Sequence, residues 1–215
     1  MSETPCCAKP AARGRRPDPR KRAAIIEAAA NLFVSHGYGI TMDAIAAQAG
    51  VSKQTIYNAF STKEDLFAAV ITSRVETVLG GLSRPLADAR PEDVLRQVAA
   101  QFLRFIAGGA SVCVQRMIIM SGSEAEPDLA RRFYENGPRR AVGLLAAYLR
   151  QETAAGRLQV DDADLAAESF LGMLNGHVHM RRLLGLQIQW DDEELARKVD
   201  YSVAVFLKAH GVSPA

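Results

Sequence analysis

The stretch MDAIAAQAGVSKQTIYNAF, residues 42–60, contains two short apolar-periodic runs separated by Gly-Val-Ser. Each run is too short to form a stable helix alone. Ile45, Ala49 and Ile56 are spaced to form the inner surface of a helix pair, and Gly50 supplies the left-handed residue that a sharp turn needs. The pattern therefore predicts a helix-turn-helix that a neighbouring helix must cover.

The second run of this pair leaves a polar outer face without an acidic side chain. Side chains of these types contact base edges and phosphates when a helix enters the major groove of DNA. The alternative is an ordinary helical hairpin whose polar face is only solvated. The outer face consists of Lys53, Gln54, Thr55, Tyr57 and Asn58.

Charge is distributed unevenly along the chain. Residues 1–60 carry eight basic and four acidic side chains, a net charge of +4, and the other 155 residues sum to −2. Residues 1–17 contain too little apolar surface to fold, and we expect a disordered basic arm there. Charge alone fits either a solvated tail or a polyanion partner. Together with the turn and the acid-free face, it favours double-stranded DNA as the partner.

Helical periodicity continues on both sides of the quoted stretch. A helix beginning near Arg20 presents Ile25, Leu32 and Phe33 on one face and is expected to stop at Gly37. Further helices are predicted at 91–107, 111–121, 127–155, 162–184 and 191–209, with a kink or division at Gly137-Pro138. The expected N-caps are Thr41, Ser52 and Ser61 or Thr62.

The predicted fold class is all-α, because no stretch shows a sustained alternation of period two. We expect a three-helix helix-turn-helix DNA-binding domain over residues 18–64, joined to a larger helical domain over residues 65–215.

Composition argues against several classes of protein. With 215 residues, 48% of them hydrophobic, the chain can bury a sizeable core. It has no long uncharged apolar run and no signal-peptide pattern, so we expect a cytoplasmic protein without a membrane partner. Cys6, Cys7 and Cys113 fit neither a disulfide framework nor a metal site, and we expect reduced thiols and no cofactor. No catalytic motif is present, and the sequence does not predict an enzyme.

The segment ITMDAIAAQAGVSKQTIYNAFSTKEDLFAAV resembles the amino-terminal module of the TetR family of transcriptional regulators, and the likeness covers about 50 residues from Arg20 to Val70. At Ala59 the family often carries an aromatic residue or His, so that contact is absent here or made by Asn58. The matching residues are Thr41, Ile45-Ala46, Ala49-Gly50-Val51-Ser52, Tyr57, Phe60 and Lys63-Glu64-Asp65-Leu66.

The resemblance implies roles for individual side chains of this module. Lys53, Gln54 and Asn58 would contact bases or adjacent phosphates. Thr41, Tyr57 and Lys63 would bond phosphates and set the register on the duplex. The arginines of the arm would add salt-sensitive affinity.

The segment from Arg116 to Gly176 resembles, more weakly, the carboxyl-terminal domains of one TetR subgroup. The likeness implies that the larger domain binds a small-molecule effector. Polar residues within apolar helices, among them Asn175, and a set of Phe and Met residues are candidates to line its site. Core packing is the alternative for each apolar member. The predicted ligand contacts are Phe102, Phe105, Arg116, Met117, Met120, Met173 and His177.

The last two predicted helices carry long apolar stripes that a thin domain would not cover by itself. In the family the corresponding helices form a four-helix bundle with a second copy, which implies a homodimer. We therefore expect a ligand-responsive regulator, a repressor released from its operator by a largely apolar or aromatic effector. The alternative is a ligand-independent architectural or activating DNA-binding protein. The stripes contain Leu165, Phe170, Met173, Leu174, Leu195, Val199, Val203 and Phe206.

Overall fold

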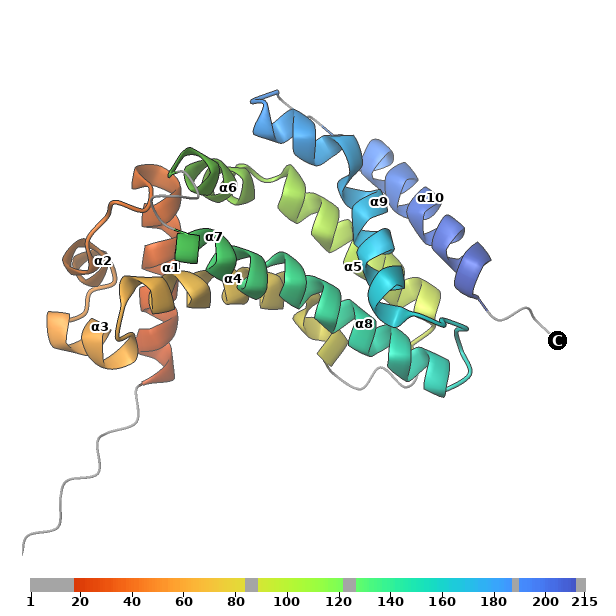
Figure 1. Ribbon diagram of the computed structural model, residues 1–215, viewed down its shortest axis with the longest axis horizontal. Coiled ribbons are helices and arrows are strands. Elements are labelled where there is room, and N and C mark those ends of the chain that lie inside the picture. The colour runs from red at the N-terminus through yellow and green to blue at the C-terminus, as the bar shows by residue number, and fades with distance from the viewer. Residues whose placement is uncertain (1–17, 84–88, 122–126, 187–189, 212–215) are drawn as a thin grey trace, which may run out of the picture.

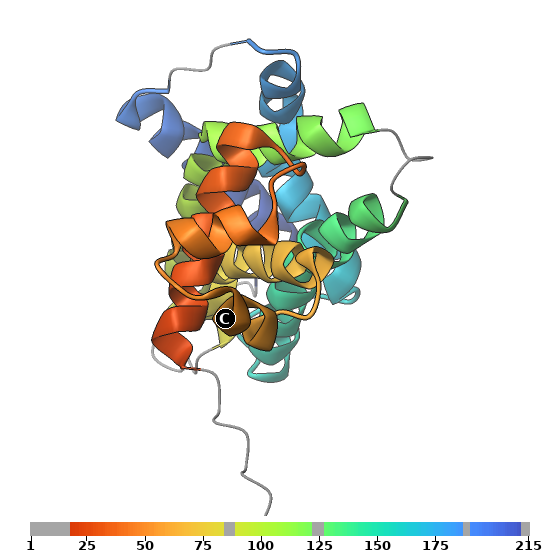
Figure 2. The same cartoon turned by 90° about the vertical axis from the view of Figure 1, so that its left-hand side faces the viewer.

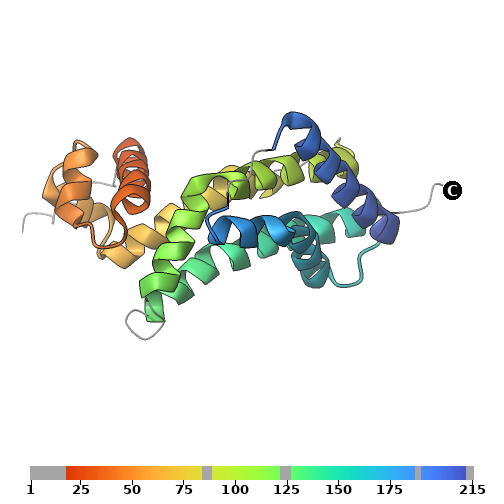
Figure 3. The same cartoon turned by 90° about the horizontal axis from the view of Figure 1, so that it is seen from above.

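A computed structural model describes residues 18–83, 89–121, 127–186 and 190–211, and it confirms the all-α prediction for these residues. The helices form two groups (Figure 1). The helices α1 to α3 lie at one end of the molecule, and α5, α8, α9 and α10 lie at the other. The helix α4 runs from the first group into the second (Figure 3). The basic arm, including Cys6 and Cys7, lies outside the described residues.

The first three helices begin within one residue of the positions that the sequence predicts. The helix α1, Pro19–His36, follows the N-cap Asp18 and ends at Gly37, where φ is 77°. The helix α2, Met42–Gln48, is capped by the Thr41 hydroxyl, and α3, Lys53–Ala59, is capped by the Ser52 hydroxyl. Gly50 has φ 64°, a conformation that favours glycine, and it makes the turn between α2 and α3.

The helix α4, Lys63–Leu79, belongs to two hydrophobic cores. Its amino-terminal half buries Leu66 and Phe67 among α1, α2 and α3. Its last turns bury Val75 and Leu79 in the core of the larger domain. The packing therefore changes from one core to the other within α4.

The larger body begins after the short 3-10 turn Gly80–Ser83. Its helices are α5 Pro91–Ala107, α6 Gly109–Ser121, α7 Pro127–Asn136, α8 Pro138–Ala154, α9 Ala163–Leu183 and α10 Asp192–His210. The single helix expected over 127–155 is divided at Gly137, because Pro138 starts a new helix. A Cβ at Gly137 would lie 2.8 Å from the Phe133 carbonyl oxygen, so the close approach of α7 requires glycine.

The helices α5, α8, α9 and α10 pack against one another around one core, which includes Leu103, Leu145 and Phe170. By contrast, α6 and α7 contribute Val114 and Leu129 to the core of the amino-terminal helices. The two domains are thus joined by α4, α6 and α7. No single helix in the described part of the chain is long and apolar enough to cross a membrane.

The apolar stripe of α9 and α10 is largely satisfied within one chain. Val203 is 1% exposed, and the rings of Phe170 and Phe206 meet edge to face with centroids 5.1 Å apart. Val203 and Phe206 are covered by α5 and α9 within one protomer, whereas Leu165 of the predicted stripe is 60% exposed. The opposite face of α10 exposes Tyr201 and Val205 instead.

Candidate DNA-reading surface and effector cavity

The outer face of α3 is held in place by a buried inner face. Ile56 is fully buried among α1, α2 and α4, so α3 cannot rotate without opening the core. Figure 2 shows α2 and α3 at the end of the molecule that faces the viewer. Thr55 is half-buried, and its hydroxyl lies 2.9 Å from that of Ser52. The exposed side chains of this face are Lys53, Gln54, Tyr57 and Asn58.

Two interactions organise this face. The Gln54 side-chain amide donates to Asn58 Oδ1 at 2.8 Å. Lys53 Nζ donates to Asp43 of α2 at 2.5 Å, and this hydrogen bond raises the pKa of Lys53. The sequence does not predict the contact of Asp43 with Lys53, because it shows the outer face of α3 but not which α2 side chain lies beside it. A phosphate that binds Lys53 has to compete with Asp43.

Thr41 and Lys63, which are predicted to flank the surface, also make hydrogen bonds within the protein. The Thr41 hydroxyl accepts from the backbone N–H of Ala44 at 3.2 Å, and a hydroxyl that accepts can still donate. Lys63 Nζ donates to the Tyr38 carbonyl at 2.9 Å and lies 4.1 Å from the centre of its ring. The Tyr38 hydroxyl in turn donates to Glu64 at 2.8 Å. Lys63 is thus half-buried and oriented by Tyr38.

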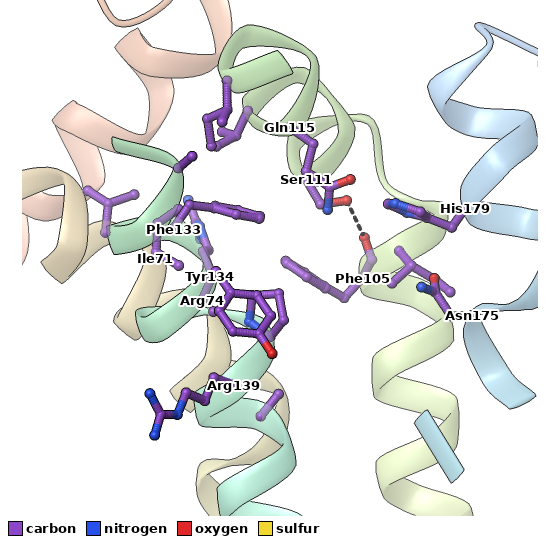
Figure 4. Close-up of a pocket in the computed structure, with 18 of the residues that line it drawn as sticks. Ile71, Arg74, Phe105, Ser111, Gln115, Phe133, Tyr134, Arg139, Asn175 and His179 are labelled. Carbon is purple, nitrogen blue, oxygen red and sulfur yellow. Dashed lines mark hydrogen bonds between the residues drawn. The ribbon is translucent and has the colours of Figure 1, made fainter. Parts of the chain in front are cut away.

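A cavity of about 770 Å³ lies between the two groups of helices. Its walls include α1 and the middle of α4 on the side of the DNA-binding module, and α5, α8 and α9 on the other side. Six aromatic side chains line it: Phe33 from α1, Phe67 from α4, Phe102 and Phe105 from α5, and Phe133 and Tyr134 from α7. Phe105, Phe133 and Tyr134 are labelled in Figure 4. The size and the mainly apolar lining are typical of sites for small organic molecules.

Neutral polar groups line one wall of the cavity. Asn175 and His179 extend from α9 toward Phe105, and Ser111 extends from α6 (Figure 4). Asn175 Oδ1 is buried and has no hydrogen-bond partner within the described chain. Burial lowers the pKa of His179, so its imidazole is neutral near pH 7.

The charged residues at the cavity offer little to an anion. Arg74 is paired with Glu27 of α1 at 3.6 Å. The guanidinium of Arg139 points away from the labelled aromatic side chains in Figure 4. Glu168 of α9 adds a carboxylate to the lining.

Of the seven predicted ligand contacts, the structure brings Phe102 and Phe105 to this cavity. Arg116, a predicted polar contact, is not among the residues that line the cavity. Its guanidinium donates to the carbonyl oxygens of Leu183 at 3.0 Å and of Arg182 at 2.7 Å. Arg116 therefore caps the carboxyl-terminal end of α9 and ties α6 to it, as the free carbonyls of a helix end require.

The other four predicted contacts do not line the cavity either. Met117 packs against the amino-terminal core, and Met173 packs against the core of the larger domain. Met120 is 84% exposed. His177 lies on another side of α9, in a smaller hollow beside Trp190.

Phe133, Tyr134 and His179 were not predicted as ligand contacts. Asn175 carried a recognisable signal, because an amide within an apolar helix needs a partner. Phe133 and Tyr134 carried no such signal, because their helix also has an ordinary polar face. The described residues contain no group of three or more His, Cys, Asp or Glu side chains that could hold a metal ion.

A helix-turn-helix module with an exposed outer face on α3, joined to a helical body across a partly open apolar cavity, is typical of helix-turn-helix transcriptional regulators. The comparisons with known proteins agree. Residues 25–70 match the family model of bacterial regulatory proteins of the tetR family. Residues 93–212 match the model of the AefR-like transcriptional repressor, C-terminal domain. The chain belongs to the TetR family of transcriptional regulators, whose members are not enzymes.

Two solved structures are similar over most of their length. The flavonoid-responsive regulator FrrA is 35% identical, with a TM-score of 0.68, over 92% of this chain and 100% of that one. A TetR-family regulator from Mesorhizobium loti MAFF303099 is 33% identical, with a TM-score of 0.71 and the same coverage. The transcriptional activator FasR of Mycolicibacterium smegmatis is 34% identical over 123 residues, which span 55% of this chain and 54% of that protein.

Proposed function

We propose that the protein is a homodimeric repressor that a small, largely aromatic effector releases from its DNA operator. The observation that carries the proposal is the position of the cavity. Its lining includes Phe33 and Val34 of α1 on one side and Phe105 of α5 on the other. An occupant that favours one arrangement of these walls therefore also favours one placement of the reading helix α3.

In this proposal Lys53, Gln54 and Asn58 form the reading surface and contact bases or adjacent phosphates. Thr55 and Tyr57 lie on the same helix, and Tyr57 is 49% exposed, which leaves its hydroxyl accessible to phosphate. Thr41 and Lys63 flank the surface. Two such surfaces in a dimer would read two half-sites about 34 to 36 Å apart, or a multiple of that distance.

The dimer of this proposal uses the exposed face of α10. Tyr201 is 71% exposed and Val205 is 39% exposed, and the two residues are one helical turn apart on the same face. Apolar side chains exposed at this spacing suit a helix that packs against its own copy. The buried stripe around Val203 holds the protomer together and does not take part.

Two similarities to known proteins support the finer parts of the proposal. The family model over residues 93–212 describes a repressor, and the similar protein FrrA is flavonoid-responsive. FasR, by contrast, is an activator, so an activating role is the second candidate.

The experiment first selects operator sequences from random duplex DNA with the full-length protein. Operator affinity is then titrated with and without apolar and aromatic compounds, and transcription from the operator is measured in vitro. Repression that a compound relieves supports the proposal. Stimulated transcription would establish the activator, and operator binding that no compound changes would favour the ligand-independent alternative.

A further inference from the structure

One hydrogen-bond acceptor in the cavity wall has no donor. Asn175 Oδ1 is buried at the cavity wall and accepts no hydrogen bond within the described chain. A buried acceptor without a partner is destabilising, and a ligand that donates to it removes that penalty. The site therefore discriminates by hydrogen bonding as well as by shape.

The groups around Asn175 can both donate and accept. His179, which follows the kink of α9 at Gly176, is kept neutral by burial, so one ring nitrogen donates and the other accepts. The Ser111 hydroxyl makes only long hydrogen bonds, at 3.4 Å to the Gly108 carbonyl and 3.5 Å to the Phe105 carbonyl. A ligand hydroxyl, which donates and accepts at one atom, matches this wall.

A carboxylate is a poor match for the same wall. It cannot donate to Asn175, and its burial without a cation is unfavourable. Arg74 is engaged by Glu27, and the carboxylate of Glu168 would repel an anion. A fatty acid or another acidic effector would have to compete with Glu27 for Arg74, or reach the Arg139 guanidinium, which points away from the labelled aromatic side chains.

The opposite walls select flat rings. Phe105 from α5 and Phe133 and Tyr134 from α7 face the same space (Figure 4). Aromatic side chains pack favourably against the edges and faces of aromatic ligands. A cavity of about 770 Å³ has room for more than one ring.

We infer that the effector is an uncharged aromatic compound of two or more rings with a phenolic hydroxyl, which donates a hydrogen bond to Asn175 Oδ1. The inference rests on the proposed function, because it names the ligand class of the same cavity. It assigns Asn175 as the residue that determines hydroxyl specificity.

The test uses matched ligands on three scaffolds: biphenyl, benzophenone and chalcone. Each scaffold is prepared with a para-hydroxyl, a para-methoxy or a para-carboxylate group, and binding to the full-length protein is measured by calorimetry. On at least one scaffold, the hydroxyl member should bind about tenfold more tightly than both of the others, since an unmet buried acceptor penalises them.

The variant Asn175→Leu should abolish the preference of hydroxyl over methoxy by weakening hydroxyl binding. It should fold at least as stably as the parent, because it removes an unpaired polar atom. Asn31→Leu is the matched control, since Asn31 is an exposed amide at the α1 side of the cavity. This control should keep the preference.

Three results would overturn the inference: tighter binding of a carboxylate, equal binding of hydroxyl and methoxy members on every scaffold, or no binding of any member at millimolar concentration. An Asn175→Leu variant that keeps the preference would overturn the assignment of that residue. The proposed function fails differently. In that case hydroxyl ligands bind with the expected preference, but the affinity for the operator does not change.

Discussion

The hydrogen-bonded pair Gln54 and Asn58 is the sharpest point at which to test the reading surface. Both side chains are exposed, and the bond of 2.8 Å between them holds each in a defined orientation. Replacement of either by Ala should change the free energy of unfolding by no more than about 0.5 kcal/mol, as for other exposed sites. Loss of a base contact weakens operator binding by about 1 to 3 kcal/mol, which corresponds to about 5- to 150-fold.

The pair should also behave as one unit. Because Gln54 orients Asn58, the double variant should lose less affinity than the sum of the single variants, with a coupling energy of about 0.5 kcal/mol or more. Fluorescence anisotropy at one fixed salt concentration measures binding to the selected operator and to scrambled DNA. Gln97→Ala, which removes an exposed amide of α5, is the control and should leave both affinities unchanged.

The reasoning is refuted if both single variants bind the operator as tightly as the parent protein. An equal loss on operator and scrambled DNA would give a different answer. It would show that Gln54 and Asn58 contact phosphates and do not read bases.

Four further predictions concern other parts of the molecule. Asp43→Asn releases Lys53 and should tighten binding to operator and random DNA alike in the same titration. Tyr201→Glu should give folded monomers by sedimentation and circular dichroism, whereas Val203→Glu should unfold the protomer by burying an unpaired charge. Arg116→Ala should lower the free energy of unfolding in urea by about 1.5 to 3 kcal/mol, since it removes charged hydrogen bonds between α6 and α9. For His179, whose folded pKa is lowered, the unfolded chain binds more protons, so stability should fall as the pH drops through about 6.5 and level off below the folded pKa. His179→Gln should flatten that slope, and an identical slope would exclude His179 as its source.

The local features of the amino-terminal module follow from the order of its residues. Thr41 and Ser52 cap their helices as predicted, and Thr62 is the one of the two candidates Ser61 and Thr62 that caps α4. Gly50 takes the left-handed conformation of the turn. These features depend on contacts between residues no more than four positions apart, so the sequence predicts them. The same holds for Gly137, where the proline that follows it divides the predicted helix.

Contacts between side chains of different helices depend on how the helices pack, which the residue order does not show. Asp43 reaches Lys53, and Arg116 caps α9 instead of facing a ligand. The cavity is formed by several helices that are distant in sequence, and periodicity does not say which neighbour covers an apolar face. For that reason the sequence placed Val203 on a stripe for a second copy, whereas the side chain lies in the core of the protomer. For the same reason the sequence did not predict Tyr134 as part of the cavity wall. Helix periodicity fixes which residues share a face, and the packing of the helices fixes what that face contacts.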